Sequence, residues 1–558
     1  MYLRPDFVPK LCLYLLFLSA AGMAACVADS NISISGPDAI DLNSSLLSFP
    51  RLDNLSIPAP PVQINDLRKT DSGAENNNQI VSTLAVIDTG MNTMGNAVLV
   101  PITPTPEGSG YSYYNTTGTD PGYLIYASGT YTLLNGFSTE NSSALRIVAS
   151  DVVLDGNAQT ILGNSRNVGI TINSGKTNTT VRKFVGIRGF YKGIDSFGDQ
   201  VSLTNNSLSD NYYGGIRASG SDFSMSRNVL FNNTDFGVFM EGTGATLTEN
   251  SIHDNEEFGL YLYSGNITLD KNVITRNGDG IICEGNNPVI HGNIAEHNDY
   301  IGIGVDGNGA IITDNVIRQN NNNLLSYGSN TTIVHNEVSS STTSYGLGIY
   351  SVADNATILE NTVSNNGYGI AVGGDNCMVT NNWAYTNNIF GINVDGTNGT
   401  ISKNIIRDTT QVGMVGLGNN FTILDNIVTK ATIGADITDI YNNYTIIGNQ
   451  FTNTSQYGIF IENSRRGTGE GVIYNNFFGS QTNVGGFGNF SNYSYIWTNP
   501  AGPQRGTNVV GGPIIAGNYW SNPTETGWSD QQTPNVSGYT TTPYEVVSEM
   551  YDTAPLVP

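Results

Sequence analysis

A column of acidic residues with one tyrosine is the first feature of the sequence that could carry out chemistry. It recurs about every 22 residues, and its members are Glu241, Tyr263, Glu284 and Asp306, with Asp395 further along the chain. Enzymes that cut polysaccharides use paired carboxylates as general acid and base, so this candidate ligand face could bind or cleave a glycan. A solvated acidic surface would show the same pattern, and both interpretations stay open.

A second group of polar residues lies in the same part of the chain and forms a candidate polar cluster. Its members are His253, Asp254, Arg276, Glu296 and His297. Side chains of these types bind metal ions or exchange protons. His253 and His297 are two repeats apart, roughly 10 Å in stacked strands, which is too far for one metal ion without further ligands. Because the sequence also contains no C-x-x-C, H-x-H or H-E-x-x-H motif, we expect neither a metal site nor a cofactor.

An asparagine that recurs about every 22 residues indicates how these side chains are positioned. The column comprises Asn206, Asn228, Asn250, Asn272, Asn293, Asn315, Asn336, Asn361, Asn382, Asn404, Asn426, Asn449 and Asn476. One apolar residue precedes each asparagine and another follows it, as Leu247 and Ile252 do around Asn250. A third follows a recurrent glycine, as Leu260 follows Gly259. Each repeat therefore contains about three short strands with alternating apolar residues.

No repeat of this size can bury its apolar residues alone, but stacked repeats can. We therefore predict an all-β fold, a right-handed, single-stranded parallel β-helix with three short strands in each coil of about 22 residues. We assign the asparagine to a bend with left-handed backbone geometry and to a ladder of amide hydrogen bonds along the stack. The recurrent glycine marks a second bend, where a positive φ or tight packing excludes a side chain.

The first residues predict export from the cell. Basic residues precede the apolar run LCLYLLFLSAAGMAA, which is typical of a signal peptide and places one in residues 1–28. Cys26 follows a sequence similar to a lipidation motif, and ordinary cleavage near Ala25 or Ala28 is the alternative. No later segment is apolar enough to span a bilayer, so we expect no transmembrane span in the mature chain. Glycosylation sequons recur at a turn before a strand, which favours a glycoprotein of the cell surface or extracellular space.

The rest of the chain divides by composition. Residues 29–80 are rich in Ser, Asn, Asp and Pro and predict a low-complexity arm. We assign residues 81–200 to an N-terminal β segment with the first coils, 201–480 to the regular β-helix, and 481–558 to a last coil and capping segment. The net charge of −24 repels phosphate backbones and argues against nucleic-acid binding.

Several phrases of the sequence carry a family resemblance. They are the N-x-I-x-x-N-x-x-G-I lines such as residues 272–281, SDVVLDGNAQTILG (150–163), GNYWS (517–521), TPY (542–544) and DTAPL (552–556). In these phrases the chain resembles the right-handed β-helix proteins of the NosD and carbohydrate-binding/sugar-hydrolase repeat group, especially exported archaeal surface proteins. The resemblance covers about residues 122–556. It is specific for the fold and unspecific for function.

Three functions follow from these observations. The sequence favours a non-enzymatic role as a glycan-binding protein, adhesin or structural component of the envelope, with envelope components or polysaccharide as partners and self-assembly left open. The alternative is a polysaccharide lyase or glycoside hydrolase that uses the candidate ligand face. The NosD resemblance implies a third role in periplasmic copper handling, although methionine and histidine residues are few and do not cluster as soft ligands.

Overall fold

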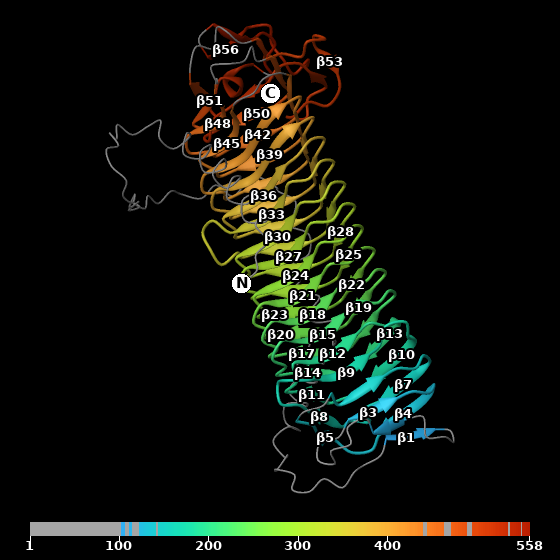
Figure 1. Ribbon diagram of the computed structural model, residues 1–558. Helices are drawn as coiled ribbons and strands as arrows, with labels where there is room; N and C mark the ends of the chain where they lie inside the picture. Colours follow the sequence, from blue (N-terminus) through green and yellow to red (C-terminus); the bar gives the residue numbers. More distant parts are fainter. Residues whose placement is uncertain are drawn as a thin grey trace. The chain divides into compact units, whose positions relative to one another are not determined.

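The chain folds into a stack of coils in which three parallel β-sheets run along the stack (Figure 1). The computed structural model describes residues 102–105, 111–113, 122–140, 143–438, 443–462, 470–487, 494–533, 536–547 and 549–558. Within these ranges the stack has about 16 turns of about 22 residues and contains no α-helix. The predicted right-handed parallel β-helix is confirmed.

All described residues belong to one compact unit. The predicted signal peptide, its Cys26 and the low-complexity arm of residues 29–80 therefore lie outside the described residues. In the part of the chain that is described, no helix has the length and apolarity needed to cross a membrane.

Each coil contributes one strand to each of three sheets, which we call A, B and C. Sheet A extends from β4 (Gly129–Leu133) to β52 (Ser494–Ile496), sheet B from β3 (Tyr123–Ile125) to β51 (Thr482–Phe487), and sheet C from β5 (Phe137–Ser138) to β55 (Tyr519–Trp520). One typical coil consists of β19 (Thr246–Thr248) in sheet A, β20 (Ser251–His253) in sheet C and β21 (Phe258–Leu262) in sheet B. The three-strand coil predicted from the apolar columns is therefore present.

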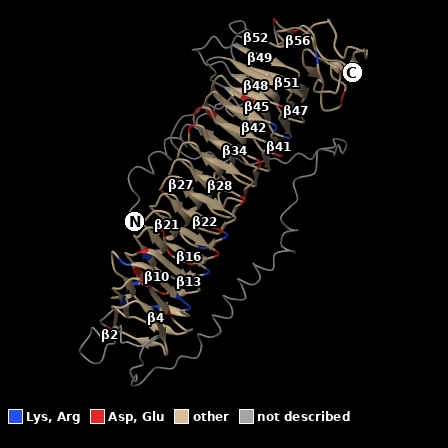
Figure 2. Cartoon of the chain, turned by 90° about the vertical axis from the view of Figure 1, so that its right-hand side faces the viewer, with Lys and Arg blue, Asp and Glu red and all other residues tan. Residues whose placement is uncertain are grey.

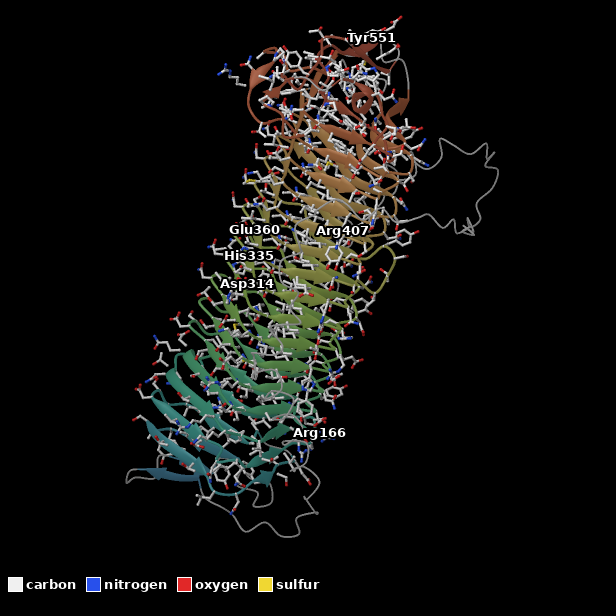
Figure 3. All side chains as sticks on the ribbon, turned by 180° about the vertical axis from the view of Figure 1, so that it is seen from behind. Arg166, Asp314, His335, Glu360, Arg407 and Tyr551 are labelled. Carbon is white, nitrogen blue, oxygen red and sulfur yellow. The ribbon has the colours of Figure 1, made fainter. Side chains whose placement is uncertain are left out.

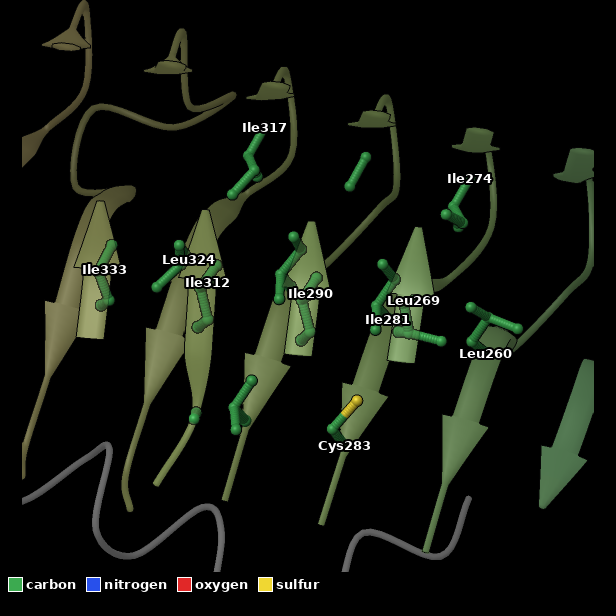
Figure 4. Close-up of a cluster of buried hydrophobic side chains, with 14 of the residues drawn as sticks. Leu260, Leu269, Ile274, Ile281, Cys283, Ile290, Ile312, Ile317, Leu324 and Ile333 are labelled. Carbon is green, nitrogen blue, oxygen red and sulfur yellow. The ribbon is translucent and has the colours of Figure 1, made fainter. Parts of the chain in front are cut away.

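The core is a set of apolar columns that run along the inside of the stack (Figure 4). Leu269 of one coil pairs with Ile290 of the next, and Leu260 pairs with Ile281. Like residues lie over like because parallel strands pair in register at about 4.8 Å. Charged residues make up only 13% of the sequence, and in Figure 2 they gather mainly at the turns between strands.

The recurrent asparagines are buried and hydrogen-bonded from coil to coil. Asn272 donates from Nδ2 to Asn293 Oδ1 at 2.9 Å and to the carbonyl of Leu247 at 2.8 Å. Its own Oδ1 accepts from the backbone N–H of Asn250 at 3.0 Å and from Asn250 Nδ2 at 2.9 Å. The same pattern recurs along the column, so each buried amide satisfies backbone groups of two neighbouring coils. We call this column the first asparagine ladder.

The backbone geometry assigned to this asparagine was wrong. Left-handed φ values occur at the residue before each ladder asparagine, for example at Glu249 (φ 53°) and Lys271 (φ 53°), and not at Asn250 or Asn272. The bend therefore falls one residue earlier, at a position that is exposed in most coils and where many residue types occur. The asparagine is needed at its own position because its amide both donates and accepts.

The recurrent glycine is explained by packing. A Cβ on Gly259 would lie 2.7 Å from the carbonyl oxygen of Gly280 and 2.7 Å from a side-chain carbon of Ile274. Since Gly259 has no positive φ, close approach of the next coil is the reason that a side chain is excluded there.

The two ends of the described stack differ from its middle. At the N-terminal end, β1 (Ile102–Thr105) pairs antiparallel with β4. At the C-terminal end a short 3-10 helix, Ser529–Gln531, and a hairpin of β56 (Tyr544–Val547) and β57 (Met550–Asp552) follow β55. These irregular segments cover strands that would otherwise expose unpaired backbone groups.

Candidate functional site

The outer face of sheet B carries the side chains of the candidate site. Its strands there are β12 (Lys192–Ser196), β15 (Gly214–Ala218), β18 (Phe236–Met240), β21 (Phe258–Leu262) and β24 (Asp279–Cys283). In β18, Val238 and Met240 belong to the apolar core inside the stack, whereas the rings of Phe236 and Phe239 pack on the other side of the strand with centroids 5.6 Å apart. Phe236 is covered there and is only 3% exposed. The first and fourth positions of such a strand therefore face outward.

Six aromatic rings form a continuous run across this face. The centroid distances are 5.1 Å for Tyr191–Tyr213, 5.2 Å for Tyr213–Phe236, 5.6 Å for Phe236–Phe239, 5.5 Å for Phe239–Tyr261 and 5.0 Å for Tyr261–Phe258. We call these six residues the aromatic run. Tyr191 and Tyr213 are stacked nearly parallel and are 36% and 37% exposed, so their rings present a flat apolar surface to solvent.

The C-terminal edge of sheet B brings part of the predicted ligand face next to this run. Tyr261 donates its hydroxyl to Glu284 Oε1 at 2.6 Å, and Tyr263 on the same coil is half exposed. Tyr263 and Glu284 line an open hollow of about 440 Å³. Its other lining residues are Ser264, Gly265, Asn266, Gly285, Asn286 and Asn287. An aromatic ring, a carboxylate and several amides therefore surround one hollow.

The remaining residues of the predicted ligand face are placed differently. Glu241 accepts a hydrogen bond from Arg217 Nη2 at 2.7 Å, so its charge is paired within the protein. Asp306 follows Glu284 by one coil and contributes to raising the pKa of Tyr327, which burial raises to about 12. Asp395 lies at the same edge but four coils beyond Asp306, and the structure does not bring it to the hollow.

Three further carboxylates lie at the N-terminal edge of sheet B, and sequence reasoning missed them. Burial, together with the hydrogen bond and charge of Glu257, raises the pKa of Asp235 to about 6. Burial raises the pKa of Asp279 to about 7, although its carboxylate accepts the backbone N–H of Ile301 at 3.0 Å. The sequence did contain an indication of these carboxylates: in three successive repeats an acidic residue lies one or two positions before the recurrent glycine.

The raised pKa of Asp279 predicts a pH dependence of stability. In the unfolded chain this carboxyl ionises near 3.8, whereas the folded protein keeps its proton up to about pH 7. The stabilisation of the folded protein by the protonated Asp279 is therefore complete below pH 4. It is lost progressively as the pH rises from about 4 to about 7, the pKa of Asp279 in the folded protein. We expect the free energy of unfolding to fall by roughly 2–3 kcal/mol between pH 5 and pH 8, since one pKa unit corresponds to about 1.4 kcal/mol.

Denaturant unfolding at a series of pH values measures this dependence, with Asp279→Asn as the matched variant. The asparagine keeps an acceptor for Ile301 but carries no titrating proton, so its stability should change less between pH 5 and pH 8. An equal slope in both proteins would show that another group is responsible.

The predicted polar cluster is only partly assembled. His253 Nδ1 lies 2.6 Å from Asp254 Oδ2, and Arg276 binds both oxygens of Asp254 at 2.7 and 2.6 Å. Arg276, followed by His253, holds the pKa of the Asp254 carboxyl below its usual value. Glu296 pairs instead with Arg318 at 2.6 Å. His297 is exposed; its backbone N–H donates to the carbonyl of Arg318 at 3.2 Å, and its side chain makes no hydrogen bond or ion pair with a described residue.

A second asparagine ladder, missing from the sequence prediction, runs beside the first. Each member donates from Nδ2 to Oδ1 of the next at 2.9–3.1 Å, through Asn211, Asn233, Asn255, Asn277, Asn298 and Asn320. Asn323 then connects this series to Asn366. The sequence indicated this ladder through the second asparagine of each N-x-x-x-x-N line. The ladder fixes the turn that leads into sheet B, and it thereby fixes the position of the aromatic run.

Comparisons with known proteins agree with the fold. A family model described as the right handed beta helix region matches residues 192–338, and one described as the periplasmic copper-binding protein NosD matches residues 325–525. No protein of curated function matches the chain significantly.

Among solved structures, similar chains include a sugar epimerase, a glycoside hydrolase and an adhesin. The A-module of the mannuronan C-5 epimerase AlgE6 of Azotobacter vinelandii has 13% identity and a TM-score of 0.36, over 67% of this chain and 88% of that one. The α-1,3-glucanase of Streptomyces thermodiastaticus has 14% identity and a TM-score of 0.21, over 62% and 61%. The surface adhesin PfbA of Streptococcus pneumoniae has 11% identity and a TM-score of 0.20, over 61% and 84%. The fold assignment itself rests on the pairing of the strands.

The residues of this chain do not fit a copper site. Between residues 325 and 525 the sequence has one histidine, one cysteine and two methionines. Cys377 is buried and donates to the carbonyl of Ala353 at 3.2 Å, and Met414 belongs to the core. Among the described residues, no three His, Cys, Asp or Glu side chains converge on a metal position as they stand. Soft ligands for monovalent copper are therefore not brought together.

Proposed function

Because the chain is a right-handed β-helix repeat protein, we propose that it binds a polysaccharide along the outer face of sheet B. The aromatic run is the observation that carries this proposal. A sugar ring presents a face of C–H groups that packs on an aromatic ring, and hydroxyl groups that bond to carboxylates and amides. The aromatic run supplies the first kind of contact, and the hollow beside Glu284 supplies the second.

The repeat of the protein suits a polymer. Successive coils lie about 4.8 Å apart, which is close to the length of one sugar unit, so a chain laid along the stack meets a similar position at each unit. Carboxylates border the aromatic run on both edges, Asp235 and Asp279 on one side and Glu284 on the other. A neutral or cationic glycan is favoured over an acidic one, since the protein carries a net charge of −24.

The proposed place of action is the cell surface or another exported compartment. The leader-like first residues and the recurrent sequons support export, and the family model that matches residues 325–525 describes a periplasmic protein. In this setting the protein acts as a glycan-binding or adhesive component of the envelope.

Binding to a panel of neutral, basic and acidic polysaccharides tests the proposal. The change is Tyr191→Ala with Tyr213→Ala in the full chain, and Tyr551→Ala is the matched control, because Tyr551 is 48% exposed in the C-terminal hairpin. A stacked ring contributes about 0.5–1.5 kcal/mol, so the double variant should bind roughly 10–100-fold more weakly. Equal binding by the double variant and the control would reject this face as the binding site.

A second candidate function is cleavage of the bound polysaccharide. It is favoured by one observation, namely that Asp235 and Asp279 retain protons close to neutral pH at the edge of the aromatic run. A carboxyl group with a raised pKa is suited to act as a general acid. The length of the bound polymer, followed for days at high protein concentration, decides between the two functions. If the unchanged protein shortens the polymer and the Asp235→Asn variant does not, the protein is an enzyme. If the polymer keeps its length with the unchanged protein, the protein is a binding protein.

A further inference from the structure

A row of exposed asparagines lies at the edge of the β-helix where the chain leaves sheet B and enters sheet A. In chain order they are Asn330, Asn355, Asn376, Asn398, Asn420 and Asn443, one from each of six successive coils, and we call them the turn row. They precede β31 (Thr332–Val334), β34 (Thr357–Leu359), β37 (Met378–Thr380), β40 (Thr400–Ser402), β43 (Thr422–Leu424) and β46 (Tyr444–Ile447). In Figure 3 the labels His335 and Glu360 mark the opposite edge of sheet A.

The members of the turn row share one backbone geometry and bond to one another through their amides. Their φ values all lie between 55° and 60°. Asn398 Nδ2 donates to Asn376 Oδ1 at 3.0 Å, Asn420 Nδ2 to Asn398 Oδ1 at 3.2 Å, and Asn443 Nδ2 to Asn420 Oδ1 at 3.2 Å. An Nδ2 atom carries two N–H groups, so one N–H on each of these donors bonds to no described residue.

Five of the six members begin an Asn-X-Thr sequon. Their threonines lie in sheet A, and they are Thr332, Thr357, Thr400, Thr422 and Thr445. Asn376 is the exception, because Met378 takes the place of threonine in its coil. Every sequon asparagine in the described ranges has a left-handed φ, whereas no asparagine of the two buried ladders begins a sequon. The sequons of the described part of the chain are therefore confined to turns.

We propose that the five sequon asparagines of the turn row carry N-linked glycans, so that sugars line this edge of the stack. In the transfer step, Nδ2 attacks the anomeric carbon of a sugar that is joined through phosphate to a carrier. The exporting cell supplies this donor and its transferase. A C–N bond forms, the C–O bond to phosphate breaks with its electron pair going to the phosphate, and one amide proton is lost to a base.

The folded chain accommodates this modification. The sugar replaces the unbonded N–H, and the remaining N–H and Oδ1 keep the hydrogen bonds between members such as Asn398 and Asn420. In the first asparagine ladder, Asn272 Nδ2 donates to both Asn293 Oδ1 and the carbonyl of Leu247, so the same change would break the ladder. Coils lie about 4.8 Å apart, so sugars on consecutive coils lie side by side and form a ridge.

The assignment rests on the proposed export of the chain and is independent of glycan binding by sheet B. Asn266 begins another sequon at the same turn, three coils before Asn330, and it lines the hollow beside Glu284. A sugar on Asn266 would fill this hollow and argue against the proposed binding site. It would leave the assignment of the turn row intact.

Site-resolved mass spectrometry of the full chain, exported by cells that glycosylate a reporter sequon, tests the proposal. The expected result is sugar on the five sequon asparagines of the turn row and none on Asn376. Thr400→Val keeps a β-branched side chain but removes the hydroxyl of the sequon, so it should abolish modification of Asn398 alone. Thr400→Ser preserves the sequon and should keep Asn398 modified.

Met378→Thr is the matched variant that adds a site. Met378 is 44% exposed and pairs in register with Thr357 and Thr400, so a threonine fits there. It completes a sequon at Asn376 and should add one glycan. If the exported chain carries no sugar on the turn row, or if Thr400→Val leaves Asn398 modified, the proposal is wrong while the proposed glycan binding stands. An unmodified Asn376 in Met378→Thr would also overturn it, because turn geometry would not define the site. A chain retained inside the cell would overturn both this proposal and the proposed export.

Discussion

Replacing Asn272 with alanine is expected to lower the free energy of unfolding by roughly 2–6 kcal/mol. The substitution leaves the backbone N–H of Asn250 without its side-chain acceptor. It also takes one of two acceptors from Asn250 Nδ2, which still donates to the carbonyl of Met225, and removes a donor from the carbonyl of Leu247. An unpaired buried N–H costs about 1–3 kcal/mol, and each of the other two lost hydrogen bonds costs about 0.5–1.5 kcal/mol. Bulk solvent does not reach these groups, because Asn250 and Asn272 are almost completely buried.

Chemical denaturation measures this effect, with Asn388→Ala as the matched control. Asn388 is exposed and its side chain makes no hydrogen bond with a described residue, so its replacement should cost less than about 0.5 kcal/mol. Both variants lose the same side-chain atoms from the same stack. If they unfolded at the same denaturant concentration, the first asparagine ladder would have no structural role.

The ladder illustrates what the sequence can predict. A solenoid repeats one environment in every coil, so a residue type that this environment requires recurs at one position and reveals the coil length. The apolar neighbours of Asn250 recur with it, and they define strands of sheets A and C, as in Leu247 of β19 and Ile252 of β20. Thirteen aligned repeats thus supply the information that an alignment of relatives would give for another fold.

The aromatic run could not be predicted in this way because the strands of sheet B are irregular. A Cβ on Gly237 would meet Ile252 in the core, and the next residue, Val238, also belongs to the core. Two successive residues therefore face inward, and the alternation on which a strand prediction depends is broken. Alternation would place Phe236 inside with Val238, whereas its ring contacts Tyr213 and Phe239 outside.

The polar cluster shows a different limit. Sequence spacing gives the coil on which a residue lies, but partner choice depends on side-chain direction. Arg276 turns toward Asp254 on the preceding coil, and Glu296 turns toward Arg318 on the following coil. The two ion pairs therefore share no partner, and His297, next to Glu296, is left exposed. Only the folded structure distinguishes these two ion pairs from a single cluster.

The C-terminal end of the first asparagine ladder depends on a different residue type. Within the ladder, the backbone N–H of each asparagine is bonded to Oδ1 of the next, as Asn476 is to Asn518 at 3.0 Å. Asn518 has no following asparagine, and its N–H donates to Asp552 Oδ2 at 2.7 Å. Trp520 Nε1 donates to the same oxygen at 2.9 Å, and Thr498 donates to Oδ1 at 3.0 Å. Asp552 therefore takes the place of the missing ladder residue.

Asp552→Ala is expected to release the C-terminal segment from the stack. The change leaves the N–H of Asn518 and the indole N–H of Trp520 buried without an acceptor, at a cost of roughly 2–6 kcal/mol. Coils of a solenoid contact only their neighbours, so the loss falls on the last coils and propagates inward. We expect faster proteolysis after residue 480 and a red-shifted tryptophan emission as Trp520 becomes exposed.

Glu545→Ala is the matched control, because Glu545 lies in the same hairpin but is exposed. It should leave proteolysis and tryptophan emission unchanged. Burial raises the pKa of Asp552 to about 6, so its carboxyl group is charged at neutral pH. Asp552→Asn removes this charge but keeps a hydrogen-bond acceptor, and it therefore separates the two contributions. Its amide keeps one acceptor oxygen, so its stability should lie between those of the unchanged protein and Asp552→Ala. If Asp552→Ala resisted protease as well as Glu545→Ala does, the end of the ladder would be held by packing of Trp520 on Phe478 and Tyr544 instead.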